Sequence, residues 1–174
     1  EVEIAEGGLS YIRISDDGCG MKQDDLTLSI ERHATSKIST ADNIYHIASL
    51  GFRGEALASI ASVARMKITT RIHESETAHW ISVEGSRITD QGETGAPQGT
   101  TVEVRELFYN VPARKKFLKS VRTEGGRINT MLGKLSMANP DIAFRLINNG
   151  RTVIETPGNG RLMDVLSALY GVDT

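Results

Sequence analysis

Apolar and polar residues alternate at the start of the chain. Val2 and Ile4 share one side of an extended segment, and Ile12 and Ile14 share one side of the next, with Glu6-Gly7-Gly8 between the two segments. A period of two residues is typical of half-buried strands. The pattern therefore predicts a β-hairpin at the N-terminal end of the chain.

The spacing of apolar residues then changes from two residues to that of a helix. In QDDLTLSIERHA two acids precede apolar residues that recur at helical spacing, namely Leu26, Ile30 and Ala34. GFRGEALASIASVA predicts a second helix, which glycines precede. Residues 35–50 lie between the two, and they are polar and rich in Ser and Thr. Loops of this length inside compact domains are commonly functional lids or disordered segments.

Three further strands are expected, at MKITTRI, HWISVEG and TTVEVREL. Between the second and the third we expect only a polar, glycine-rich connection that leads to Gly99. Pro112 marks the start of a helix, and a longer helical pattern follows through Ile128, Met131, Leu132 and Leu135.

The last third of the chain predicts a hairpin and a helix. Asn149-Gly150 separates the strands AFRLINN and RTVIE, and the helix RLMDVLSALYG is expected to end near Gly171. Together the elements predict an α+β fold, a two-layer sandwich in which helices cover one face of a mixed, mostly antiparallel sheet.

Composition limits the classes of protein to which the chain can belong. Of its 174 residues, 39% are hydrophobic and 24% are charged, as expected for one compact domain, or one with a short extension. The sequence contains no apolar run of transmembrane length and no signal peptide, so we expect a soluble intracellular protein. The single cysteine excludes an internal disulfide, and the histidines lack the spacing of a zinc site. The net charge of -2 leaves room only for a local basic surface.

The stretch DDGCGM, residues 16–21, contains two acids and two glycines around this cysteine. It lacks the alternating acids and the closing Glu of an EF-hand calcium loop. Asp16 at the end of a strand could accept a hydrogen bond from an amino group, and Gly18 and Gly20 would let the backbone approach a flat ligand or adopt a positive φ. Two interpretations stay open, a base-binding pocket and a plain turn. Cys19 is expected to pack as a small residue.

Two further segments carry groups that suit phosphate. In GFRGEAL, Gly51 and Gly54 precede a helix whose free N–H groups could bind an anion, and Arg53 adds a cation. Lys37, in HATSK, stands beside hydroxyl residues in the expected lid. The alternatives are glycines that merely start a helix and a solvated lysine.

Basic residues gather in one part of the chain. Between positions 114 and 127 the only acid is Glu124, and six cations give a net charge of +5 in a chain of -2. These cations are Arg114, Lys115, Lys116, Lys119, Arg122 and Arg127. Such a segment could follow a DNA backbone through phosphate contacts without reading bases. An ordinary solvated helix face is the alternative.

The order and wording of several motifs resemble one protein family. DDGCGM, RHATSKI, SLGFRGEALASIASV, GTTVEV and LFYNVPARKKFL follow one another as they do in the MutL family of DNA mismatch repair ATPases, which belongs to the GHKL superfamily. DxGxG is shared with other members of that superfamily, whereas GFRGEAL and FYNVPARKKF are much more restricted. The resemblance covers essentially the whole chain and implies the GHKL, or Bergerat, two-layer sandwich.

Carried over motif by motif, the resemblance implies an ATP site. Asp16 would bind the adenine amino group, Gly18 and Gly20 would shape the pocket, and Thr100 would support the adenine through Asp16 or a bridging water. Residues 33–38 would begin the ATP lid. The triphosphate would be bound by lid residues and by the glycine-rich segment that follows, namely Thr35, Ser36, Lys37, Gly51, Phe52, Arg53, Gly54, Glu55, Ala56 and Leu57. The implied cofactors are ATP and Mg²⁺.

One part of the family pattern has no counterpart in the sequence. The family's first motif is a helix with a Glu that activates water and, four residues later, an Asn that binds Mg²⁺. Glu106 and Asn110 have that spacing, but they lie on the far side of the sheet order and are not expected to replace the pair. We therefore expect no catalytic residue, no metal ligand and no measurable ATP turnover in this chain alone. Residues 1–155 would be the ATPase domain without its first helix, and residues 156–174 the lead-in to a second, ribosomal protein S5-like transducer domain.

The resemblance also implies partners. ATP binding would order the lid and promote homodimerisation through N-terminal domains. A mismatch-recognition protein and a repair nuclease or helicase would bind the protein in response to this conformational change. DNA would be bound without sequence specificity through the basic segment, and no membrane is expected. The implied location is the bacterial cytosol, or the nucleus of a eukaryote. Two other functions stay open: a DNA-binding module with a vestigial nucleotide pocket, and a sensor kinase catalytic domain, for which only DxGxG argues.

Overall fold

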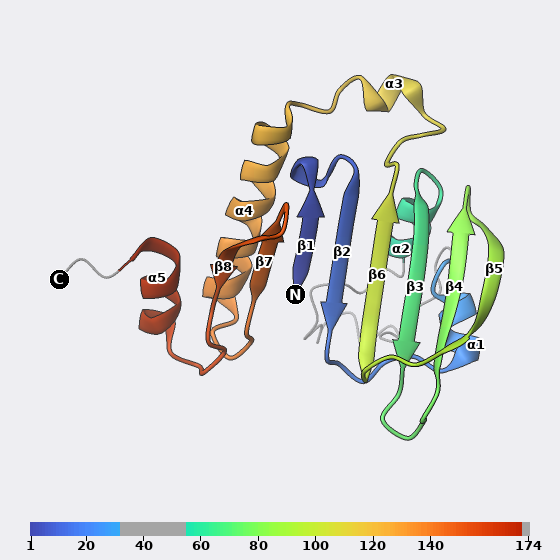
Figure 1. Cartoon of the computed structure of the whole chain (residues 1–174), viewed down its shortest axis with the longest axis horizontal. Coiled ribbons are helices and arrows are strands. Elements are labelled where there is room, and N and C mark those ends of the chain that lie inside the picture. The colour runs from blue at the N-terminus through green and yellow to red at the C-terminus, as the bar shows by residue number, and fades with distance from the viewer. Residues whose placement is uncertain (32–54, 172–174) are drawn as a thin grey trace, which may run out of the picture.

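One mixed sheet runs through the computed structural model, which describes residues 1–31 and 55–171 (Figure 1). The strand order across the sheet is β5-β4-β3-β6-β2-β1-β7-β8. The pairing of β1 with β7 is parallel and that of every other neighbouring pair of these strands is antiparallel. The strands are β1 Val2–Ala5, β2 Tyr11–Asp16, β3 Arg65–Arg71, β4 Ala78–Glu84, β5 Arg87–Thr94, β6 Gly99–Arg105, β7 Arg145–Asn148 and β8 Arg151–Glu155.

Helices cover one face of this sheet, as the sequence predicts (Figure 1). α1 contacts β4, α2 contacts β3, and α4 contacts β7, β8 and the short 3₁₀ turn η1, while α5 packs on α4 and β8. Their bounds are η1 Glu6–Gly8, α1 Gln23–Leu28, α2 Ala56–Ala61, α3 Pro112–Lys115, α4 Val121–Ala138 and α5 Leu162–Tyr170. The fold is therefore an α+β sandwich of two layers.

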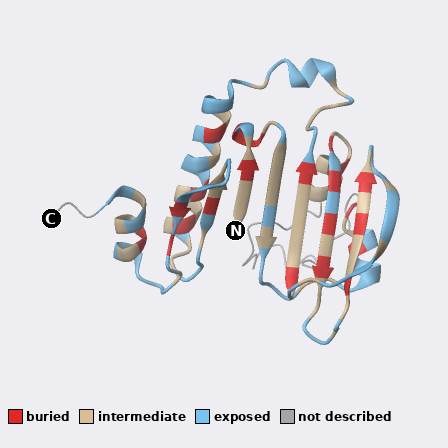
Figure 2. Cartoon of the chain, in the orientation of Figure 1, coloured by how far each residue is buried: buried red, intermediate tan, exposed pale blue. Residues whose placement is uncertain are grey.

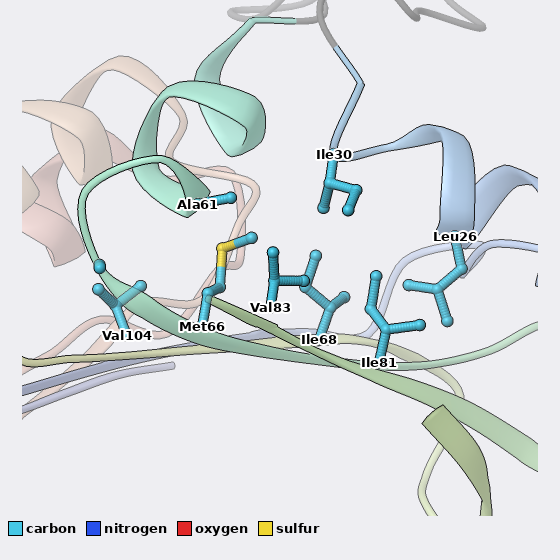
Figure 3. Packing of buried hydrophobic residues seen from close by; sticks show 9 residues of the cluster. Leu26, Ile30, Ala61, Met66, Ile68, Ile81, Val83 and Val104 are labelled. Atoms are coloured by element: carbon cyan, nitrogen blue, oxygen red, sulfur yellow. The ribbon is translucent and has the colours of Figure 1, made fainter. Parts of the chain in front are cut away.

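The larger hydrophobic cluster lies between α1, α2 and the strands β3, β4 and β6. Figure 3 shows Leu26 and Ile30 from the α1 side meeting Ile68 and Ile81 of the sheet, with Ala61 of α2 beside them. Every second residue of β3 points into this cluster, as a period of two requires. Burying one such Leu or Ile side chain contributes about 1.5–3 kcal/mol to stability, so this cluster is the main anchor of both short helices.

A second cluster lies under α4. It contains Ile4, Leu132, Leu146 and Ile154, and Ile12 of β2 packs against both clusters. Ile12 therefore joins the two halves of the core at the centre of the sheet.

Figure 2 shows buried residues in red that alternate along β3 with intermediate and exposed ones. The residues between the buried ones point to the opposite face of the sheet, which is polar. Its cations are paired with acids on neighbouring strands: Arg13 binds Glu3 at 3.0 Å and Arg65 binds Glu84 at 3.2 Å. Lys67 instead lies over the Trp80 ring, 4.5 Å from its centroid. Charge is thus compensated across this face.

Most of the expected elements are confirmed, but two expectations are wrong. The sequence predicts that Cys19 packs as a small residue, but it is exposed, and one connection contains a strand that the sequence does not predict. The connection that leads to Gly99 contains the strand β5, which pairs with β4 along its whole length. Most of its side chains are exposed because it is an edge strand, so no alternation of apolar residues marks it in the sequence. Main-chain pairing with β4 defines this strand. The boundary expected at residues 155–156 stays a prediction.

Candidate functional site

Asp16 is the last residue of β2 and lies opposite Thr100 at the start of β6. Its Oδ1 accepts hydrogen bonds from the backbone N–H of Gly18, at 2.9 Å, and of Thr100, at 3.3 Å. The other carboxylate oxygen, Oδ2, has no hydrogen-bond partner among the described residues. The backbone thus fixes the carboxylate and leaves one oxygen as an acceptor for a ligand.

Two glycines let the surrounding loops close on Asp16. A Cβ on Gly20, which has a φ of +71°, would lie 2.1 Å from the carbonyl oxygen of Arg71. A Cβ on Gly99, with a φ of +110°, would lie 2.0 Å from the carbonyl oxygen of Asp16. Any other residue at either position would clash with backbone and strain its own φ. Gly18 does not have a positive φ, but a Cβ there would lie 2.8 Å from Asp16 Oδ1.

Thr70, near the end of β3, holds three segments together. It is 1% exposed, and its Oγ1 donates to the carbonyl of Gly99 at 3.1 Å and accepts from the N–H of Met21 at 2.9 Å. Its Oγ1 also lies 3.0 Å from Thr100 Oγ1. One buried hydroxyl therefore joins the DDGCGM loop to the β5–β6 corner.

A second set of hydrogen bonds supports the same loop from outside. Gln98 Nε2 donates to the carbonyl of Gly18 at 3.2 Å, and His73 Nδ1 lies 3.1 Å from Gln98 Oε1. Arg71 donates to the carbonyls of Ala96, at 2.6 Å, and Ser75, at 2.8 Å. These contacts hold the β3–β4 and β5–β6 connections beside the carboxylate.

An apolar surface lies next to Asp16 on the helix-covered face. Ile14 precedes Asp16 by two residues on the same side of β2 and is 49% exposed, and its partners Val2 and Val102 are half-buried. The two core clusters lie on either side of this position. A flat ligand could rest on this surface with its polar edge at Asp16.

The structure brings only some of the expected site residues together. Asp16, Gly18, Gly20 and Thr100 meet as described above, whereas Thr35, Ser36, Lys37, Gly51, Phe52, Arg53 and Gly54 lie outside the described residues. Glu55 is the N-cap residue of α2, Ala56 is the exposed first residue of that helix, and Leu57 packs against the larger core cluster. Leu57 is thus a packing residue in the described part of the chain.

Sequence reasoning missed Thr70 and Gln98. Thr70 was detectable in principle, because it continues the buried register of Met66 and Ile68 with a polar side chain. A polar group on an apolar strand face needs a buried partner. Gln98 carries no such signal, since it lies in a connection in which apolar residues do not recur at a regular spacing.

Glu106 and Asn110 lie at the opposite end of β6 from Asp16, as the sequence order predicts. Glu106 accepts a hydrogen bond from Arg65 at 3.1 Å, and Asn110 Nδ2 donates to the carbonyl of Ser62, just after α2, at 2.9 Å. Both side chains are thus engaged far from the candidate pocket. In the described part of the chain, no group of His, Cys, Asp and Glu side chains could hold a metal ion.

The basic segment lies beyond the end of β6 and continues into α4. Its side chains at Arg114, Lys115, Lys116, Lys119 and Arg122 are exposed, and none forms an ion pair with a described residue. Arg127 is different, because its guanidinium lies 3.1 Å from Glu124. The five unpaired cations contrast with the paired arginines of the open sheet face.

Glu124 stabilises the start of α4. The backbone N–H of Lys119 donates to its Oε1 at 2.9 Å, and this bond together with the nearby Arg127 lowers the pKa of the Glu124 carboxyl below its ordinary value. The carboxylate near the helix N-terminus also suits the helix dipole. Glu124 therefore stabilises the helix start, and its ion pair is with Arg127 and with none of the five cations.

Several curated proteins are similar to this chain in sequence. MutL, the DNA mismatch repair protein, of Agathobacter rectalis is 48% identical over 170 residues, which are 98% of this chain and 26% of that protein. MutL of Clostridium beijerinckii is 50% identical over 170 residues, with the same coverage, and MutL of Neisseria meningitidis is 46% identical over 173 residues. The chain thus spans about a quarter of the length of these relatives. No family model matches the sequence.

Solved structures share the fold. The Aquifex aeolicus MutL ATPase domain complexed with ADP is 28% identical, with a TM-score of 0.76 over 97% of this chain and 59% of that one. The N-terminal domain of a DNA repair protein is also 28% identical, with a TM-score of 0.80 over 98% of this chain and 50% of that one. None of the helices that the structure describes is long and apolar enough to cross a membrane.

Proposed function

The chain belongs to the MutL family of DNA mismatch repair proteins, and we propose that its described residues form the adenine side of an ATP site. Asp16 carries this proposal. Its Oδ1 is held by two backbone N–H groups, so its free Oδ2 is pre-positioned to accept a hydrogen bond from the adenine amino group. Ile14 would lie against the face of the base, and Thr100 beside its polar edge.

The described residues fit the base of a nucleotide. The pocket supplies a fixed acceptor and an apolar surface, which a purine with an exocyclic amino group matches. In the described part of the chain, no group of His, Cys, Asp and Glu side chains could hold Mg²⁺. We therefore propose nucleotide binding as the activity of this region and assign no hydrolytic step to it.

Removing the Asp16 carboxylate tests this proposal. In Asp16→Ala, a fluorescent ATP analogue should bind at least about 10-fold more weakly, because a hydrogen bond to a charged group contributes about 1.5–3 kcal/mol. Asp17→Ala is the matched control, since Asp17 is exposed and makes no hydrogen bond with a described residue. Equal affinity of the two variants, or no saturable binding by the unmodified protein, would contradict the proposal.

For the whole protein we propose an ATP-dependent switch. ATP would order a lid, favour homodimerisation of N-terminal domains and so couple mismatch recognition to strand excision by a nuclease or helicase. Similarity to MutL proteins over 98% of the chain supports this wider role. Residues 156–174, which include α5, would lead into a second domain.

DNA binding by the basic segment is a second candidate function. It is supported by five exposed cations without an ion-pair partner among the described residues, next to a sheet face whose arginines are paired. Phosphates would compensate these charges without sequence specificity. This function is compatible with nucleotide binding, because the segment lies at the opposite end of β6 from Asp16.

A further inference from the structure

The hydroxyl of Thr70 has all its hydrogen-bonding capacity in use. A threonine hydroxyl has one proton to donate and two lone pairs to accept with. The proton goes to the carbonyl oxygen of Gly99, at 3.1 Å, and one lone pair accepts the N–H of Met21, at 2.9 Å. Only the second lone pair remains for Thr100 Oγ1, which is 3.0 Å away.

The 3.0 Å contact between the two hydroxyls leaves the donor open, and this accounting assigns it. Because Thr70 has no second proton, Thr100 must donate, and its own proton then points to Thr70 and away from the pocket. Thr70 is 1% exposed, so no solvent molecule offers it another partner. Toward a ligand, Thr100 can then present only lone pairs.

Thr100 lies opposite Asp16 in the register of β6 and β2, on the same face of the sheet. Asp16 Oδ2 is also an acceptor, so the two side-chain oxygens at this edge, Asp16 Oδ2 and Thr100 Oγ1, would both act as acceptors toward a ligand. A purine with an amino group at C6 donates to such an edge. At the C6 position, a keto oxygen would place an acceptor against these two acceptors, which is unfavourable. The 6-keto purine also carries a proton on N1, and the expected preference concerns the C6 substituent alone.

We propose that Thr70 is a positioning residue that sets base specificity, because it forces the Thr100 hydroxyl to act as an acceptor toward the base. This inference rests on the proposed nucleotide site. Thr70 touches no ligand itself and acts through Thr100.

The experiment compares the affinities of ATP and inosine triphosphate, whose bases differ in having an amino or a keto group at C6. In Thr70→Val the Thr100 proton loses its acceptor and becomes free to donate to the keto oxygen. The ratio of the inosine triphosphate Kd to the ATP Kd should therefore fall about threefold to tenfold, the range of one neutral hydrogen bond. Thr70→Ser keeps the hydroxyl and should keep the ratio.

Thr101→Val is the matched control. Thr101 lies next to Thr100 but on the other face of the sheet, where its Oγ1 is 2.8 Å from Ser15 Oγ. Its loss should leave the ratio unchanged. If Thr70→Val melts below the assay temperature, Thr70→Cys replaces it, because a thiol is a weak donor and acceptor.

The outcomes separate the two proposals. Equal weakening of both nucleotides in Thr70→Val would show that Thr70 only supports the loop and would overturn its role in specificity, while leaving the ATP site intact. A protein that binds neither nucleotide before mutation would overturn the proposed function and this inference together.

Discussion

At the scale of single residues, the candidate site depends on close backbone approach. Gly20 contacts the backbone of β3 and Gly99 contacts the backbone of β2, and both have a positive φ. The carboxylate of Asp16 is oriented by N–H groups that these turns bring within reach. The shape of the turns at Gly20 and Gly99 therefore determines how the Asp16 carboxylate is oriented toward a ligand.

Gly20→Ala should disturb this arrangement. The new Cβ would lie 2.1 Å from a backbone oxygen at a φ of +71°, so the loop must move. We expect a loss of about 1–3 kcal/mol in the free energy of unfolding, measured by urea denaturation, and weaker binding of the fluorescent ATP analogue. Gly95→Ala, where no heavy atom lies within 4 Å of the new Cβ, should change stability by less than about 0.5 kcal/mol. Equal effects would contradict the close-approach argument.

At the scale of elements, α4 shows how a helix start is secured. Ser120 is the N-cap residue, and its Oγ accepts a hydrogen bond from the N–H of Thr123 at 3.3 Å. Glu124 adds the bond from the Lys119 N–H and an ion pair with Arg127. The helix can thus begin directly after the basic segment in spite of its positive charge.

The lowered pKa of Glu124 gives this element a pH dependence. The carboxylate is favoured in the folded state, so its contribution to stability is fully present above the unfolded value near 4.5 and is lost as pH falls through the lower folded pKa. The difference in thermal midpoint between the unmodified protein and Glu124→Gln should therefore shrink on acidification from about pH 7 to about pH 3. Glu93→Gln, on the exposed edge strand, is the control, and a constant difference for Glu124→Gln would refute this assignment.

At the scale of the whole molecule, positive charge is concentrated in one segment of a chain that is negative overall. The net charge of the chain is -2, yet residues 114–122 carry five cations without an ion-pair partner among the described residues. On the open sheet face, acids on adjacent strands pair with Arg13, Arg65 and Arg145, and Lys67 lies over the Trp80 ring. The basic segment therefore presents to a polyanion a run of cations that have no ion-pair partner among the described residues.

Replacing Lys115, Lys116 and Lys119 with Ala should weaken DNA binding and flatten its salt dependence. The slope of log K against log salt should fall by about 0.9 for each phosphate that the protein no longer neutralises. The control removes the same charge from the sheet face, in the triple variant R13A, R65A and R145A. Similar slopes for the two triple variants would reject the basic segment as the DNA-binding surface.

Much of the fold is encoded in local pattern. The alternation of Val2, Ile4, Ile12 and Ile14 predicts the first hairpin, and Asn149-Gly150 predicts the last one, because period and turn chemistry are properties of neighbouring residues. The order of the motifs likewise indicates the family, and Asp16 as the residue of interest. Each of these signals lies within a few consecutive positions.

The tertiary structure decided what depends on partners distant in sequence. β5 is a strand because β4 pairs with it, although its own residues show no alternation. Thr70 meets Met21 and Gly99 across 49 and 29 positions of sequence, so its control of Thr100 could not be inferred from any local pattern. Sequence determined which groups are present. The packing of the sheet decided which oxygen of Asp16 is free and brought the hydroxyls of Thr70 and Thr100 into contact, because hydrogen bonds are satisfied in space and not along the chain.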